Sequence, residues 1–216
     1  LALDSEPAAV RTYNLNRAKS MPARIQDLAQ CGPANLLNLW KQAAGEKRPV
    51  GVIGGPPCQA FSAGNVHKDI SDPRRALTVR YAELLAALQD TYDLDFFLFE
   101  NVLGLMKPSN QDVFREFVRI CWDAGFSVRE PILLNAVDYG VPQVRRRLFV
   151  VGLNREKFSV DRYHRPEGSG EASVVRDALS GLPDPMFFAR GMSPKELGLH
   201  PNHWCMNPRS RKFQDG

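Results

Sequence analysis

Apolar runs of strand length alternate with longer helical patterns over roughly the first 150 residues, and this alternation limits the fold most. The runs PVGVIGG (49–55) and LDFFLFE (94–100) are rich in β-branched and aromatic residues. Runs of this kind are typical of strands buried in a parallel sheet. Helical patterns follow each of them. The alternation predicts an α/β fold with a mainly parallel sheet and helices on both faces.

Several element boundaries can be predicted from turn and capping residues. We expect Ser5 and Ser109 to cap helices, Pro73 to open the long helix that runs to Tyr92, and Gly45 to end another. The stretch 127–136 is expected to be one continuous strand, followed by a further strand over 146–154. These are the elements that would frame a site.

Reactive or acidic residues follow the predicted strands at or just beyond their ends. They are Asp4, Asp27, Cys58 and Glu100. Because the carboxyl ends of parallel strands meet at one edge of a sheet, and ligands bind there, we expect these residues to form a site.

Cys58 differs from the other three cysteines in its surroundings. It lies in VIGGPPCQAFSAGN (52–65), directly after a predicted buried strand, where two glycines permit a tight turn and two prolines stiffen it. A thiol held in this way suits a nucleophile, which must meet its target at a fixed distance. We interpret Cys31, Cys121 and Cys205 as small packing residues.

Composition restricts the function classes only loosely. The chain of 216 residues is 44% hydrophobic and 24% charged, with a formal charge of +4, and basic residues gather at 143–148 and 207–213. This balance is compatible with a polyanionic partner. No apolar run approaches the length of a membrane span, so we expect no membrane partner. The cysteines and histidines show no metal-ligand spacing, and a reducing, cytoplasmic compartment is expected.

After Gly152 the alternation of strand and helix patterns gives way to polar and proline-rich stretches. We expect a catalytic domain over 1–160, a polar linker with a short helix over 161–185, and an incomplete irregular module over 186–216.

Four ordered motifs, within residues 1–153, resemble those of the cytosine-5 DNA methyltransferases. They are GGPPCQAFS (54–62), DPRRAL (72–77), DFFLFENVLGLM (95–106) and LLNAVDYGVPQVRRRLFVVG (133–152). The resemblance implies a Rossmann-like fold of the class I S-adenosylmethionine-dependent methyltransferases. It also implies duplex DNA as the partner, with S-adenosylmethionine as the cofactor.

The resemblance implies catalytic roles for four residues. Cys58 would add to carbon 6 of a flipped cytosine, and Glu100 would hydrogen-bond the ring nitrogen and the exocyclic amine. Arg145 and Arg147, two apart on an extended segment, would share a face and point into the site. Guanidinium groups there could hold the cytosine carbonyl oxygen and a phosphate.

The same resemblance implies residues for DNA and for the cofactor. On the DNA side, Asn101 and Gln143 would order loops, Gln59 and Ser62 would contact the nucleotide, and the stretch 62–72 would close over the flipped base. The cofactor would contact Asp4, Ser5, Asp27, Leu28, Pro57 and Leu77.

The chain departs from the family pattern at both ends. The Phe-x-Gly-x-Gly motif of the family is not found, and its recognition region and closing motifs are not evident. We therefore expect little activity from these residues alone. Alternatives to a complete, monomeric bacterial enzyme are one part of a split methyltransferase with a complementing chain, an inactive binding module, and a tRNA methylator. The recognition sequence cannot be deduced, because base readout would lie in the region not found.

Overall fold

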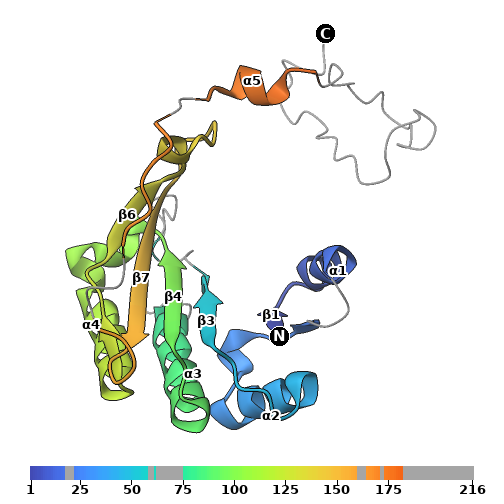
Figure 1. Ribbon diagram of the computed structural model, residues 1–216, viewed down its shortest axis with the longest axis vertical. Helices are drawn as coiled ribbons and strands as arrows, with labels where there is room; N and C mark the ends of the chain where they lie inside the picture. Colours follow the sequence, from blue (N-terminus) through green and yellow to red (C-terminus); the bar gives the residue numbers. More distant parts are fainter. Residues whose placement is uncertain (18–21, 58–60, 62–74, 160–163, 171–172, 182–216) are drawn as a thin grey trace. The chain divides into compact units, whose positions relative to one another are not determined.

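The computed structural model describes residues 1–17, 22–57, 61, 75–159, 164–170 and 173–181. The chain divides into two compact units, Leu1–Val174 and Val175–Gly216. In the second unit the structure describes the helix α5 (Val175–Leu179). All other elements belong to the first unit (Figure 1).

The first unit begins with two short parallel strands joined by a helix. They are β1 (Ala2–Asp4), α1 (Pro7–Asn16) and β2 (Ala23–Ile25). The Asn14 amide accepts a bond from the Ala23 N–H at 2.7 Å and donates to the Ala23 carbonyl at 3.1 Å. The predicted cap of α1 was wrong by one residue. Glu6, rather than Ser5, caps the helix by accepting from the Ala8 N–H at 3.1 Å.

A second sheet of five strands forms the centre of the unit. Its path is β3 (Gly51–Gly54), β4 (Phe96–Asn101), β7 (Arg146–Asn154) and β5 (Phe126–Val128), and β6 (Ile132–Asn135) also pairs with β7. Strands β3 and β4 are parallel, whereas β7 is antiparallel to β4, β5 and β6. The α/β class predicted from the sequence is confirmed, and the sheet is mixed.

The continuous strand predicted over 127–136 was wrong. The stretch forms β5 and β6, which pair with different parts of β7. Pro131 lies between them and has no N–H to donate to a ladder, so a break at this point is physically reasonable.

Three longer helices complete the unit. They are α2 (Pro33–Ala44), α3 (Ala76–Tyr92) and α4 (Gln111–Asp123). Gly45 ends α2 as predicted, with a φ of +63° that favours glycine. Asn110, rather than Ser109, directly precedes α4. The helix expected to open at Pro73 begins at Ala76, and Pro73 lies outside the described residues.

Short 3₁₀ turns connect these elements. They are η1 (Leu28–Gln30), η4 (Leu103–Met106), η5 (Pro108–Asn110) and η6 (Ala136–Tyr139).

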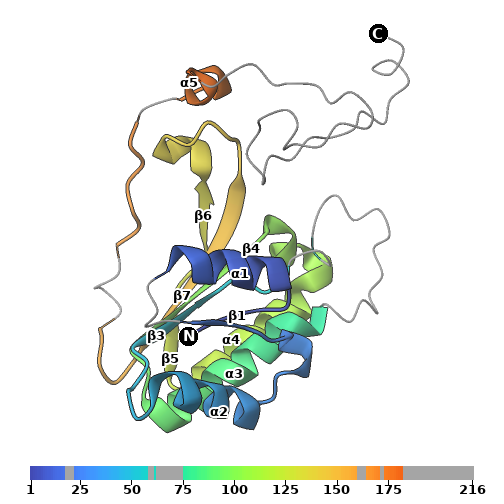
Figure 2. The same ribbon diagram turned by 90° about the vertical axis from the view of Figure 1, so that its right-hand side faces the viewer.

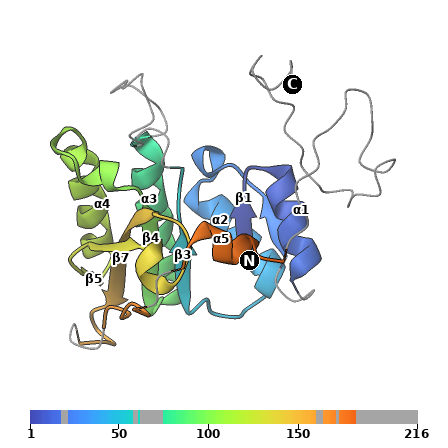
Figure 3. The same ribbon diagram turned by 90° about the horizontal axis from the view of Figure 1, so that it is seen from above.

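The core lies between the central sheet and the pair α3 and α4, which cover the same face of the sheet (Figure 3). Phe97 and Phe99 of β4 are fully buried there and contact Phe117 of α4, with ring centroids 5.9 and 4.6 Å apart. Burying one such ring contributes about 1.5–3 kcal/mol. Gly152 of β7 leaves room for Phe97, because a Cβ there would lie 2.0 Å from its ring.

The edge of the central sheet at β3 is paired on one side only, considering the described strands. Ile53 of β3 is 72% exposed, and Ile25 of β2 is 59% exposed. Such exposure of apolar side chains is unusual in parallel strands, because parallel sheets are normally covered on both faces. In Figure 2, β3 and β1 lie beside each other as parts of separate sheets.

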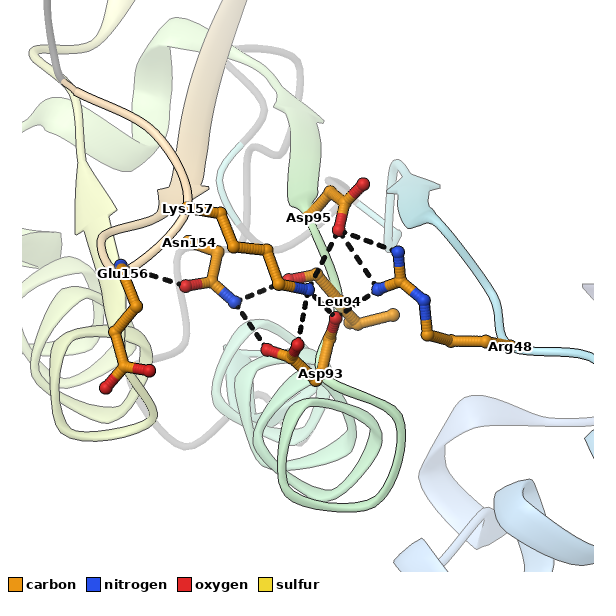
Figure 4. Close-up of polar contacts among 7 residues, drawn as sticks. All are labelled: Arg48, Asp93, Leu94, Asp95, Asn154, Glu156 and Lys157. Atoms are coloured by element: carbon orange, nitrogen blue, oxygen red, sulfur yellow. Dashed lines mark hydrogen bonds and ion pairs between the residues drawn. The ribbon is translucent and has the colours of Figure 1, made fainter.

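A network of charged side chains lies at the end of the central sheet where β4 begins and β7 ends (Figure 4). The Asp95 carboxylate accepts bonds from the Arg48 guanidinium and the Lys157 ammonium, both at 3.0 Å. Lys157 also pairs with Asp93 at 2.5 Å, and the buried Asn154 amide donates to Asp93 at 2.8 Å. The network therefore joins the chain before β3 to the start of β4 and the end of β7.

Hydrogen bonds from Lys157 lower the pKa of Asp93 and of Asp95. A carboxyl group with a lowered pKa in the folded state contributes stability above its unfolded pKa. That contribution is lost as the pH falls through the folded pKa.

We predict that Lys157→Met lowers the melting temperature by a few degrees at neutral pH. The difference from the wild-type chain should shrink below about pH 4, as Asp93 and Asp95 become protonated. Thermal unfolding followed by circular dichroism across this range measures it. Lys41→Met is the matched control, because Lys41 and its partner Glu46 are largely exposed. If the difference in melting temperature between Lys157→Met and the wild-type chain stays constant with pH, Lys157 does not stabilise the chain through the ionised Asp93 and Asp95.

Candidate active site

An ion pair joins the ends of two central strands. The Nε of Arg147, on β7, lies 2.9 Å from Oε1 of Glu100, on β4. Strand register explains the pair: Glu100 is opposite Phe149, so Arg147 lies diagonally across on the same face. The side chain of Glu100 is 36% exposed and that of Arg147 is 23% exposed, so both can be reached from solvent.

Gly55, the first residue after β3, leaves room for this carboxylate. A Cβ at Gly55 would lie 2.8 Å from Oε2 of Glu100. The glycine of the Gly-Pro-Pro-Cys segment therefore allows the loop to run close beside the carboxylate. Sequence reasoning assigned this glycine only to turn formation.

Asn101, at the end of β4, holds the same loop from the buried face of the sheet. Its side chain is fully buried, and its amide donates to the Pro56 carbonyl at 3.5 Å. Its Oδ1 accepts from the Val102 N–H at 2.9 Å, which fixes the orientation of the amide. A buried amide held at both ends in this way gives the loop a defined position at the end of β4.

A second set of contacts lies beyond the cysteine in the sequence. Phe61 is 3% exposed, and its carbonyl oxygen would be 1.7 Å from a Cβ at Gly104. Asn110 donates to the Gly104 carbonyl at 2.7 Å, and the Arg75 guanidinium bonds to Asn110. Sequence reasoning missed these four residues. The DPRRAL segment did draw attention to the neighbourhood of Arg75.

Arg145 and Gln143 lie in the turn that leads into β7, and both are exposed. The Arg145 N–H donates to Oδ1 of Asn135 at 3.0 Å, and its carbonyl accepts from the Ala136 N–H, which extends the β6–β7 pairing by one step. The described ion pair of Glu100 is with Arg147. The structure therefore brings Glu100 and Arg147 together and leaves Arg145 toward solvent.

The acids expected at the cofactor lie at strand ends and are exposed. Asp4 ends β1, and its Oδ1 accepts from the Glu6 N–H at 2.8 Å. Asp27 follows β2, and its Oδ1 accepts from the Ala29 N–H at 2.9 Å. The described bonds of each carboxylate use Oδ1, and a carboxylate has a second acceptor oxygen, so these acceptors fit the hydroxyl donors of a ribose and the amine donor of an adenine.

The remaining cofactor candidates show different degrees of burial. Ser5 and Pro57 are exposed, Leu28 packs against the core, and Leu77 is 8% exposed at the start of α3. Cys58, Gln59 and Ser62 lie outside the described residues, as does the stretch 62–72 that was expected to close over the base.

In the described part of the chain, no group of histidine, cysteine or acidic side chains is arranged to hold a metal ion. Of the helices described, none has the length and apolar character that a membrane crossing requires.

Comparison with solved structures identifies the class of fold as that of the class I S-adenosylmethionine-dependent methyltransferases. A DNA modification methyltransferase encoded within an E. coli prophage superposes with a TM-score of 0.67 at 27% identity, covering 86% of this chain and 49% of that one. The S. pombe Dnmt2 methyltransferase is similar in fold, with a TM-score of 0.55 at 23% identity, covering 85% of this chain and 53% of that one.

Residues 1–189 match the model of the C-5 cytosine-specific DNA methylase family, and the chain belongs to this family. The Type II methyltransferase M.SacI of Streptomyces achromogenes is 33% identical over an alignment of 205 positions, which covers 85% of this chain and 49% of that protein. M.MthTI of Methanothermobacter thermautotrophicus is 38% identical over 136 residues, 63% of this chain and 39% of that protein. The chain thus spans half or less of the length of these curated relatives.

We predict that Gly104→Ala destabilises the chain by about 1–3 kcal/mol, because the new Cβ would collide with the Phe61 carbonyl. Urea unfolding measures the change. Gly32→Ala is the control, since a Cβ at Gly32 meets nothing within 4 Å. Equal effects of the two substitutions would show that Phe61 does not pack against Gly104.

Proposed function

We propose that the chain carries the catalytic centre of a DNA (cytosine-5-)-methyltransferase. It would methylate carbon 5 of a flipped cytosine in duplex DNA, through a covalent adduct with Cys58. The observation that carries this proposal is the Glu100–Arg147 pair beside the loop that leads into Cys58. Family membership and the Type II methyltransferase relatives support it.

The proposed chemistry requires a nucleophile because carbon 5 of cytosine is poorly reactive. The Cys58 thiolate adds to carbon 6, and the electron pair of the 5,6 double bond becomes available at carbon 5 as an enamine. Once carbon 5 is methylated, a base, which we take to be a water, removes its proton. The electrons of that C–H bond restore the double bond and expel the thiolate.

Glu100 is proposed to bind the ring nitrogen and the exocyclic amine of the cytosine. Its exposure of 36% leaves the carboxylate accessible to a base entering the site. Arg147 holds the carboxylate in place and carries a positive charge that favours the thiolate and the cytosine carbonyl oxygen. Arg145 is proposed to bind a phosphate or the carbonyl oxygen, and its exposure is compatible with either.

S-adenosylmethionine, when bound, supplies an electrophilic methyl group. Asp4 and Asp27 are proposed to accept its ribose and adenine donors, with Ser5 and Leu28 beside the adenine. Pro57 and Leu77 would line the methionine side. Asn101 and Gln143 order the surrounding loops, and Gln59 and Ser62 are proposed to contact the DNA.

We also propose that activity requires polypeptide in addition to these residues, either adjoining segments or a complementing chain. The edge of β3, which pairs with none of the described strands other than β4, and the exposed Ile53 support this. The domain division at 1–160, 161–185 and 186–216 is part of the same proposal. The complete enzyme is proposed to be a monomer that acts on DNA in the bacterial cytoplasm.

We predict that the chain, with adjoining segments restored, forms a covalent complex with duplex DNA that contains 5-fluorocytosine. Fluorine at carbon 5 cannot leave as a proton does, so the adduct persists. A band of reduced mobility on a denaturing gel, dependent on S-adenosylmethionine, measures it. Cys58→Ser should abolish the band, whereas Cys31→Ser should retain it in the fraction of protein that folds.

Failure of this experiment has a specific meaning. If the restored protein binds S-adenosylmethionine and DNA but forms no adduct, the methyltransferase proposal is wrong and a binding module is favoured. An adduct formed equally well by the 216 residues alone would instead contradict the need for further polypeptide. A preference for RNA that carries the same base would indicate a tRNA methylator.

We predict that Glu100→Gln lowers methyl transfer by about 10²–10³-fold, because a charged acceptor that orients the base is lost. Incorporation of labelled methyl groups into DNA measures it. Glu83→Gln is the control, since Glu83 pairs with Arg80 on α3 at 2.7 Å with similar exposure. Equal activity of the two variants would remove Glu100 from the reaction.

A further inference from the structure

The side chain of Arg75, the residue directly before α3, is largely buried and makes several contacts with other segments. It is 11% exposed and bonds to Oδ1 of Asn110, to the Ser109 carbonyl at 3.3 Å and to the Asp112 carboxylate at 3.4 Å. Its guanidinium also lies 5.7 Å from the centroid of the Phe61 ring. Arg75 therefore connects the start of α4 to a residue of the loop that follows β3.

Phe61 is fixed from two sides by these contacts. Its ring faces the Arg75 guanidinium, and its carbonyl lies against the backbone of Gly104, where no Cβ would fit. Asn110, 6% exposed, links the two sides, because it donates to the Gly104 carbonyl and accepts from Arg75. Phe61, Gly104, Asn110 and Arg75 thus form a closed set of contacts, which we call the Phe61 bracket.

Phe61, the centre of the Phe61 bracket, lies three residues beyond Cys58 in the sequence. On the other side of the cysteine, Asn101 holds the Pro56 carbonyl. Asn101 is the last residue of β4, directly after Glu100, and Gly104 lies in η4, which follows β4. Both flanks of Cys58 are therefore anchored to the segment that also carries the carboxylate.

We propose that Arg75 is a positioning residue for Cys58: through Phe61 it fixes the loop so that the thiol keeps a constant distance from the base bound at Glu100. This inference rests on the proposed function. A cation that faces a ring is attracted by the ring's quadrupole, and this attraction is stronger where both groups are shielded from water, so it favours one conformation of the loop. A misplacement of about 1 Å at a reacting group can cost on the order of 10²-fold in rate.

Single-turnover formation of the 5-fluorocytosine adduct tests the proposal, in the same preparation in which the wild-type chain forms it. We expect Arg75→Ala to slow adduct formation by about 10- to 100-fold at saturating DNA and cofactor. Arg75→Lys keeps the charge toward Asp112 but lacks the planar group, and should recover only part of the rate. Arg115→Ala is the control, because Arg115 is exposed on α4 and its bond among the described residues is to Gln111 on the same helix.

The pH profile separates positioning from electrostatic activation of the thiol. A positioning role predicts that Arg75→Ala slows the reaction by the same factor at every pH. A deficit that disappears at high pH would overturn the proposal, since Arg75 would then act on the thiol pKa. Wild-type rates in the folded Arg75→Ala protein would also overturn it.

A double-mutant comparison with Phe61→Leu guards against a purely structural loss. If Arg75 acts through Phe61, the double variant should react no more slowly than the slower single variant. Multiplicative losses would overturn the proposal. Absence of any adduct with the wild-type protein, with its adjoining segments restored, would instead refute the proposed function, so the two failures are distinguishable.

Discussion

The alternation of side chains along β4 is the constraint on which the rest of the structure depends. Phe97, Phe99 and Asn101 point to the buried face, whereas Phe96, Leu98 and Glu100 are only partly covered. Burial of the two rings against Phe117 sets this register, because a slip of one residue would exchange the two faces. Core packing therefore determines that Asn101 reaches the loop from below while Glu100 remains available to a ligand.

The reactive end and the charged end of the central sheet are stabilised by different means. At the reactive end, buried amides and close backbone contacts hold the loop, and one partly exposed ion pair spans β4 and β7. At the other end, Lys157 and Arg48 gather two carboxylates into a network (Figure 4). The network of Lys157 and Arg48 thus stabilises the end of the sheet that lies opposite the Glu100–Arg147 pair.

The sequence predicts the α/β class, the central strands and the acids at their ends, because each is encoded in a local run or a short motif. It does not predict the break at Pro131 or the caps at Glu6 and Asn110, since these depend on how neighbouring strands and turns pair. The Glu100–Arg147 contact requires an antiparallel register between distant strands. The contacts of Arg75, Phe61, Gly104 and Asn110 likewise arise only from tertiary packing.

The pairing of β4 with β7 also has a consequence for the order of folding. The two strands are far apart in the chain, and long-range pairings form slowly. During synthesis, β3, β4 and the cysteine leave the ribosome well before Arg147 does. A nascent chain therefore carries the segment around Cys58, the proposed nucleophile, before Arg147 can pair with Glu100, and this pair forms only when β7 has docked against β4.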